Sequence, residues 1–384
     1  MSLWFSATAV APELAAQWGL SPAETAWLTT SVQLGFVAGA LLSAALTLSD
    51  VVRPRYLFAG SAVLGAAATA TIAAGVDSLV PAVALRFLTG VALAGVYPPG
   101  MKMIAGWFRT GRGFAIGVLV GAVAVGSAIP HLLRAVAGGV AHPRLVLLQA
   151  SALAVVGGLL VLFVTDGPYQ SPAAPFDPGA VGRILRDRGT LLANAGYFGH
   201  MWELFSVWTW IPAYLLASFE ASGQAAAGDV AGVVTFATIA AGGLGAGVAG
   251  LAADRWGRTT VTSLSMVVSG LSCLAAGALF GAPLVVLVPF CLLWGVAVVA
   301  DSAQFSACVT ELADASYVGT ALTLQTALGF LLTVVTIQLV PLVAAAVGWR
   351  WAFAPVAIGP AFGTLAMLRL RSLPEARRLA GGHR

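Results

Sequence analysis

The sequence predicts an all-α polytopic membrane protein, and two features carry that prediction. The 384-residue chain is 59% hydrophobic and only 9% charged. Soluble domains carry roughly 25% charged residues, so a soluble globular protein is excluded. Apolar runs of about twenty residues recur along the chain, each long enough to cross a hydrocarbon core of about 30 Å as a helix. We therefore expect about 12 transmembrane helices.

The expected spans are apolar runs separated by short polar or proline-bearing intervals. They cover residues 24–48, 56–75, 79–101, 113–137, 145–164, 190–219, 229–253, 259–280, 283–309, 317–347 and 351–370. The preceding apolar segment, within 1–18, is too short to span, and we interpret it as the outer half of a truncated first helix. The polar interval 165–189 predicts an N-terminal six-helix bundle over 1–164, a linker over 165–189, and a C-terminal bundle with a short tail over 190–384.

The arginines set the expected orientation. Most of the 19 basic residues lie in alternate loops or at the C-terminal end. The positive-inside rule makes that side cytoplasmic. We therefore expect both termini in the cytoplasm.

Several function classes receive no support. The net charge of +4 reflects where arginines lie relative to the membrane, so no nucleic-acid partner is expected. The three cysteines lie inside apolar runs without metal-ligand spacing, which predicts buried thiols and no metal site. Neither a Walker-type phosphate loop nor a nucleophile elbow is present, so we expect no enzyme, no ATP-driven pump and no cofactor.

A polar island over 250–258 joins two of the expected spans. Gly250 allows close helix packing, and Gly257 permits a turn conformation that other residues resist. Asp254 and Arg258 lie one helical turn apart, on either side of Arg255, and can pair with each other or cap a neighbouring helix. The island therefore predicts a tight, charged turn between two membrane helices.

A weaker copy of this island follows the second span. Asp50 follows that span as Asp254 follows the eighth, although the copy lacks the flanking glycines. Gly113 opens the fifth span as Gly319 opens the eleventh, at nearly the same sequence separation. The repeat predicts two related halves.

The island resembles the signature loop of the major facilitator superfamily, and the run from Arg86 to Gly90 resembles an arginine-glycine element in that family's fourth helix. The resemblance covers the chain apart from the short first segment. It implies two six-helix bundles that rock about a central cavity, gated by the island and by the loop carrying Asp50. The run 301–306, followed by 319–329, is similar to bacterial members near the nitrate/nitrite porters, but the nitrate signatures are absent. We therefore expect a monomer in the bacterial inner membrane that does not carry nitrate.

Polar residues within spans are candidates for the transport pathway, because such residues are costly in lipid unless they face protein or water. His200 and Glu203 lie three residues apart in the seventh span, and Asp301 precedes Gln304 in the tenth. The repeat places Asp301 opposite Tyr97 of the first half, beside a proline-containing helix break. The acids suit reversible protonation; the alternative for the first pair is a His–Glu hydrogen bond that holds two helices together.

Arg86, inside the fourth span, has two open interpretations. It could attract an anionic substrate into the cavity, or it could lock neighbouring helices together.

Together these features predict a secondary active transporter in the lipid bilayer that moves a small polar or anionic solute by alternating access. Proton coupling would run through Glu203 and Asp301. One alternative is proton-driven efflux of amphipathic drugs, which the acids and the tryptophans of the seventh span would suit. A second is a non-transporting sensor or assembly factor on a transporter scaffold.

Overall fold

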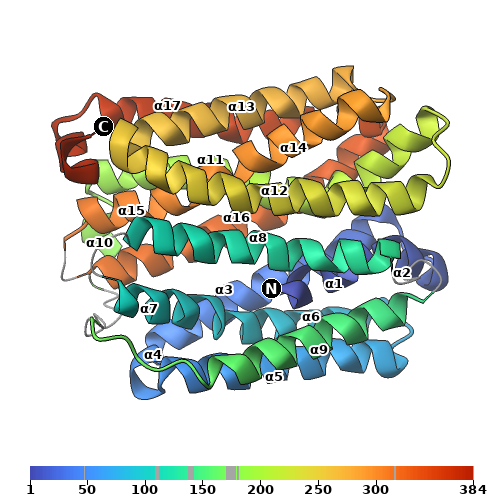
Figure 1. The fold of residues 1–384 in the computed structure, drawn as a ribbon, viewed down its shortest axis with the longest axis horizontal. Helices are drawn as coiled ribbons and strands as arrows, with labels where there is room; N and C mark the ends of the chain where they lie inside the picture. The colour runs from blue at the N-terminus through green and yellow to red at the C-terminus, as the bar shows by residue number, and fades with distance from the viewer. Residues whose placement is uncertain are drawn as a thin grey trace.

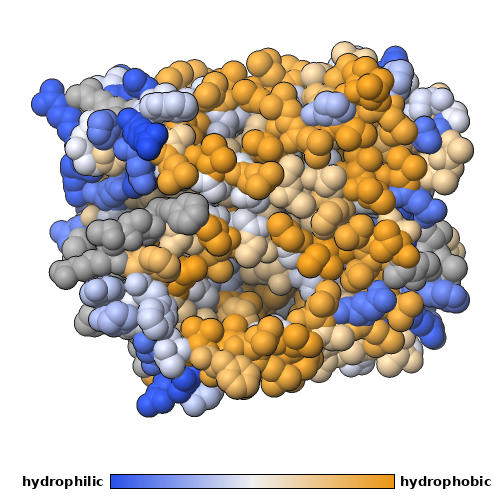
Figure 2. Space-filling view, in the orientation of Figure 1, coloured by the Kyte–Doolittle hydropathy of each residue, from blue (hydrophilic) through white to orange (hydrophobic). Residues whose placement is uncertain are grey.

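The computed structural model describes residues 1–46, 48–108, 112–136, 142–169, 179, 181–314 and 317–383, without the side chains of 49, 50, 105 and 112–114. Long helices run side by side along the longest axis of the molecule (Figure 1). Within the described residues, ten of them are long and apolar enough to cross a membrane. Figure 2 shows an apolar band across the middle of the visible face, with hydrophilic residues gathered toward its two ends.

The first half of the chain forms one group of helices. They are α1 (Ser2–Ala9), α2 (Ala11–Trp18), α3 (Pro22–Ala45), α4 (Leu48–Val51), α5 (Pro54–Gly75), α6 (Leu79–Ala94), α7 (Tyr97–Trp107), α8 (Arg112–Val136) and α9 (Pro143–Val161). The short helices α1 and α2 meet at Val10, and α6 and α7 together form one broken span.

The second half forms a related group after the short helix α10 (Val181–Ile184). It contains α11 (Arg188–Ala221), α12 (Ala227–Trp256), α13 (Arg258–Ala278), α14 (Leu284–Ala300), α15 (Ser302–Leu312), α16 (Val318–Val347), η2 (Trp349–Trp351), η3 (Ala354–Ala357), α17 (Ile358–Arg371) and η4 (Pro374–Gly382). Helices α14 and α15 form a second broken span, as α6 and α7 do in the first half. The predicted all-α fold of two six-helix bundles is confirmed.

Local sequence signals fix several helix ends. Ser21 caps α3 in a capping box, because its hydroxyl accepts from the Glu24 backbone N–H while the Glu24 carboxylate accepts from the Ser21 backbone N–H. The Asp187 carboxylate caps α11 by accepting from the Thr190 backbone N–H at 2.8 Å. Gly257, at φ +92°, separates α12 from α13, as its predicted turn role requires.

Two helix pairs join the bundles: α8 packs along α12, as Figure 1 shows, and α3 packs on α16. The first pair is a close backbone contact, because a Cβ on Gly121 would lie 3.0 Å from the carbonyl oxygen of Gly243, and the reverse distance is the same. Small residues allow such approach in membranes, where packing rather than water drives helix association. Gly121 and Gly243 thus let α8 and α12 approach closely where the two bundles meet.

Candidate transport site

A cavity of about 440 Å³ lies between the two bundles. Its walls come from α1, α3, α7 and α8 of the first half and from α11, α14, α15 and α16 of the second, together with the first residue of α13. Lining by both halves is what a site exposed alternately to each side of a membrane needs. We therefore treat this cavity as the candidate transport site.

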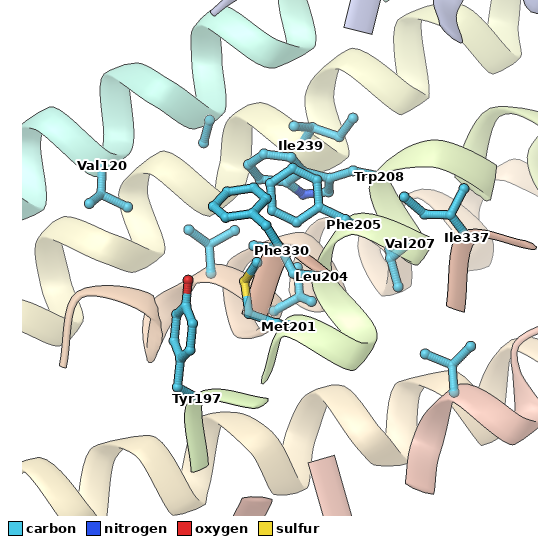
Figure 3. Packing of buried hydrophobic residues seen from close by; sticks show 14 of the residues in the cluster. Val120, Tyr197, Met201, Leu204, Phe205, Val207, Trp208, Ile239, Phe330 and Ile337 are labelled. Carbon is cyan, nitrogen blue, oxygen red and sulfur yellow. The ribbon is translucent and has the colours of Figure 1, made fainter. Parts of the chain in front are cut away.

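Aromatic rings close one end of the cavity. Trp4 and Phe36 of the first half meet Phe205 and Phe330 of the second, with ring centroids 5.0 Å apart for Trp4 and Phe36 and 4.5 Å apart for Phe36 and Phe330. Figure 3 shows Phe205 and Phe330 gathered beside Trp208, with Met201 and Tyr197 following along α11. We call Trp4, Phe36, Phe205, Trp208 and Phe330 the aromatic floor; all five line the cavity.

The bundles also join beyond this floor. The Gln338 side-chain amide donates to the Thr30 hydroxyl at 3.3 Å, linking α16 to α3. Within the C-terminal bundle, the Trp210 indole N–H donates to the Ile337 carbonyl oxygen at 2.8 Å, which holds α11 against α16 next to this contact. The opposite end of the cavity is lined by Arg258 and Glu311, where α12 turns into α13.

Two of the predicted pathway residues, Tyr97 and Gln304, line the cavity. Tyr97 is the first residue of α7, and Asp301 is the residue that immediately precedes α15. The helix breaks therefore lie at the matched positions that the repeat predicts.

His200 and Asp301 form a buried pair behind the cavity wall. His200 Nδ1 lies 2.9 Å from Asp301 Oδ1, and both side chains are only 2% exposed. Among the described residues neither the imidazole Nε2 nor Asp301 Oδ1 has a hydrogen-bond partner, so the close approach of Nδ1 to Oδ1 is not aligned as a hydrogen bond. The pair joins α11 to the break between α14 and α15, one residue before the cavity-lining Ser302.

Glu203 is satisfied within the C-terminal bundle. Its carboxylate accepts from the Ser269 hydroxyl at 2.8 Å, the Trp294 indole N–H at 3.1 Å and the Cys273 thiol at 3.2 Å. These donors come from α13 and α14. The alternative of a His200–Glu203 hydrogen bond is therefore wrong, because each residue has its partner on another helix.

Arg86 lies outside the residues that line the cavity and is fully buried. Its Nε donates to the Leu28 carbonyl oxygen at 3.0 Å, and its Nη1 donates to the Leu3 carbonyl oxygen at 2.7 Å. Its Nη2 donates to the carbonyl oxygen of Trp4. The guanidinium thus ties α1 and α3 to α6, an arrangement that favours the helix-locking interpretation over anion attraction.

The charged turn is organised by Arg258. Its Nη2 lies 2.6 Å from a Glu311 carboxylate oxygen, and its Nη1 donates to the Gln304 side-chain oxygen at 2.8 Å. The predicted partner Asp254 is more distant, at 3.8 Å. Glu311 also accepts from the Ala380 backbone N–H at 3.0 Å, so the C-terminal segment is tied into the same network.

The remaining predicted gating residues contribute less to this network. Gly250 is buried in α12, and Arg255 is exposed near its end. The side chain of Asp50 lies outside the described residues.

Sequence reasoning missed Glu311 and the three donors to Glu203. Glu311 had a detectable signal, since it follows Gln304 by seven residues and so lies on the same helix face two turns later. Ser269, Cys273 and Trp294 had none, because hydroxyl, thiol and indole groups are common within apolar spans.

We expect a double-mutant cycle to reveal direct coupling between Arg258 and Glu311. Arg258→Gln and Glu311→Gln should each lower thermal stability, because each leaves a part-buried charge without its partner. The double variant should lose less than the sum, with a coupling energy of about 1–3 kcal/mol. Thermal unfolding of the purified variants in lipid nanodiscs measures this, and additive losses would contradict the pairing.

Comparisons with known proteins agree with this architecture. A family model described as Major Facilitator Superfamily matches residues 1–237. A solved structure of a mutant of the nucleoside transporter NupG is similar in fold, with a TM-score of 0.73 over 96% of each chain at 15% sequence identity. No curated protein sequence matches the chain. With its membrane-spanning helices and central cavity, the chain belongs to the Major Facilitator Superfamily of secondary transporters.

Proposed function

We propose that the protein carries a small, uncharged polar solute across the membrane and couples that movement to protons at the Asp301–His200 pair. The observation that carries the coupling is the 2.9 Å contact between these buried side chains, at the helix break behind the cavity. Ionisable groups inside a membrane protein are costly and are typical of proton pathways.

The cavity lining supports an uncharged solute. Arg258 and Glu311 are the charged side chains among its described lining residues, and they pair with each other. An anion would therefore have to displace Glu311 from Arg258 to find a cationic partner. The fold neighbour is a nucleoside transporter, and a nucleoside is uncharged and polar, so nucleosides belong in the first solute panel.

Coupling would follow from the position of the pair. Asp301 is the residue that immediately precedes α15, and α15 supplies polar side chains to the cavity wall. Protonating the carboxylate removes its charge and weakens its attraction to His200, which loosens α15 from α11. Proton occupancy and the shape of the solute site are thereby linked. We assign coupling to this pair and a helix-holding role to Glu203, whose three donors bind it to α13 and α14.

The sidedness and the gate are part of the same proposal. The arginine-rich end would face the cytoplasm, with both termini there and the bundles divided at the 165–189 linker. The turn from Gly250 to Arg258 would hold this end together while the opposite end opens.

The test is proton movement in proteoliposomes loaded with a pH-sensitive dye and challenged with uncharged nucleosides and polyols. Asp301→Asn is expected to abolish solute-driven proton flux while retaining exchange of labelled solute across the membrane. Asp77→Asn is the matched control, because Asp77 pairs with Arg144 on the surface. Normal proton flux in Asp301→Asn would show that coupling lies elsewhere.

Efflux of amphipathic drugs is the second candidate, favoured by the aromatic floor of the cavity. Proton flux driven by lipophilic cations alone would support it over the uncharged solute.

A further inference from the structure

One wall of the cavity carries a regular row of hydroxyl groups. Ser302, Ser306 and Thr310 follow one another at four-residue intervals on α15, and all three line the cavity. Side chains at this spacing lie on one helix face, roughly 6 Å apart along the axis. We call these three residues the hydroxyl face; it extends for about 12 Å.

The facing wall, from the N-terminal bundle, is mostly apolar, although Tyr97 and Ser127 also line it. Met101 of α7 and Ile116, Val120 and Val123 of α8 line it, and the aromatic floor closes one end. The cavity therefore offers a row of hydroxyl groups from the C-terminal bundle, mostly apolar contact from the N-terminal bundle, and aromatic rings at one end. A ligand that satisfies all three needs a polar edge and a planar apolar part.

The bonding of the hydroxyl face sets the polarity of its ligand. The Ser306 hydroxyl donates to the Gln325 side-chain oxygen at 3.3 Å, and the Thr310 hydroxyl donates to the Ser306 carbonyl oxygen at 2.8 Å. A hydroxyl whose proton is committed keeps its lone pairs to accept. Ser306 and Thr310 are therefore available as acceptors, so the ligand groups that meet them should donate hydrogen bonds.

We propose that the cavity binds uncharged glycosides with a planar aglycone, a class that includes nucleosides. The sugar hydroxyls donate to Ser306 and Thr310, and the aglycone lies against the aromatic floor. Sugar hydroxyls supply several donors in a row, and a planar ring gains dispersion and ring contacts on aromatic side chains. The inference rests on the proposed function for the claim that this cavity is the transport site.

Binding can be followed by quenching of tryptophan fluorescence, because Trp4 and Trp208 line the cavity. The protein should be held in lipid nanodiscs, since maltoside detergents are themselves glycosides. The probes are uridine and phenyl β-D-glucoside. Ribose and methyl β-D-glucoside lack the planar ring, whereas uracil lacks the sugar. Each complete glycoside is expected to bind at least about tenfold more tightly than its fragments.

Substitutions then test the hydroxyl face itself. Ser306→Ala and Thr310→Val should each weaken uridine binding by roughly two- to tenfold, the usual effect of one lost hydrogen bond. Neither should change the affinity for 2′,3′-dideoxyuridine, which lacks two of the sugar hydroxyls. Ser272→Ala is the matched control, because the Ser272 hydroxyl donates to the Val268 carbonyl oxygen on α13, outside the cavity lining.

The possible failures are distinguishable. Equal affinity for glycosides and fragments, no glycoside binding, or equal losses for uridine and its dideoxy analogue would overturn the glycoside assignment. If the glycoside assignment failed in this way but another uncharged solute drove an Asp301-dependent proton flux, the proposed function would still be supported. Glycoside binding without Asp301-dependent flux would support the ligand class and overturn the coupling.

Discussion

Replacing Arg86 by methionine is expected to detach α1 from the N-terminal bundle and to lower the stability of the protein by roughly 3–6 kcal/mol. The guanidinium donates to carbonyl oxygens of Leu3, Trp4 and Leu28, and methionine keeps most of the side-chain length without any donor. Each lost hydrogen bond from a charged donor costs about 1.5–3 kcal/mol, and the total is less than additive. Arg86→Lys should recover only part of the loss, because an ammonium cannot reproduce the planar fork of donors.

Thermal unfolding in nanodiscs measures the effect, with Arg144→Met as the control. Arg144 pairs with Asp77, but their side chains are 53% and 75% exposed. Losing that pair should therefore change stability by no more than about 1 kcal/mol. An Arg86→Met variant of normal stability that had lost transport would instead restore a direct role for Arg86 in solute binding.

The fold was predictable because lipid leaves few alternatives. Backbone polar groups within the membrane must form hydrogen bonds inside the protein, so a long apolar run becomes a helix. The length of each run shows whether it can cross the membrane, and the number of such runs gives the number of crossings. The repeat added the symmetry of the two halves. It matched Asp301 to Tyr97, and the structure places both at the breaks of the equivalent spans α14–α15 and α6–α7.

The partners of the buried polar residues were not predictable in the same way. His200 and Glu203 lie three residues apart on one helix, and from the sequence alone a hydrogen bond between them was one of the open alternatives. Their actual contacts depend on which helices pack against α11. Asp301 meets His200, whereas the donors to Glu203 lie 66, 70 and 91 residues away along the chain.

Arg86 shows a second limit of sequence reasoning. Its acceptors are backbone carbonyl oxygens, which every residue has, so no side chain in the sequence marks them. A charged residue inside a span signals a costly group that must be satisfied. Whether its hydrogen-bond partners come from a substrate or from a neighbouring helix depends on how the helices pack. For Arg86 they come from α1 and α3, which contact α6.

Gly295→Ala is expected to be the most damaging small substitution in the C-terminal bundle. A Cβ at this position would lie 1.8 Å from the carbonyl oxygen of Thr238, so α14 and α12 would have to separate. The obstacle is helix backbone rather than a flexible side chain, so local adjustment cannot relieve it. We expect a loss of about 3 kcal/mol or more, at the upper end of overpacking costs.

Gly247→Ala provides the control, because Gly247 lies in the interior of α12 and a Cβ there has no atom within 4 Å. This variant should retain stability or gain up to about 1 kcal/mol, since alanine favours helix more than glycine does. Comparing the unfolding midpoints of the two variants in the same nanodiscs separates the effect of the steric clash between α12 and α14 from the effect of alanine's higher helix propensity. If both alanines were equally tolerated, α12 and α14 would be free to move apart, and the C-terminal bundle could not rock as one rigid unit. A selective loss at Gly295 would support the rigid bundle that the alternating-access proposal requires.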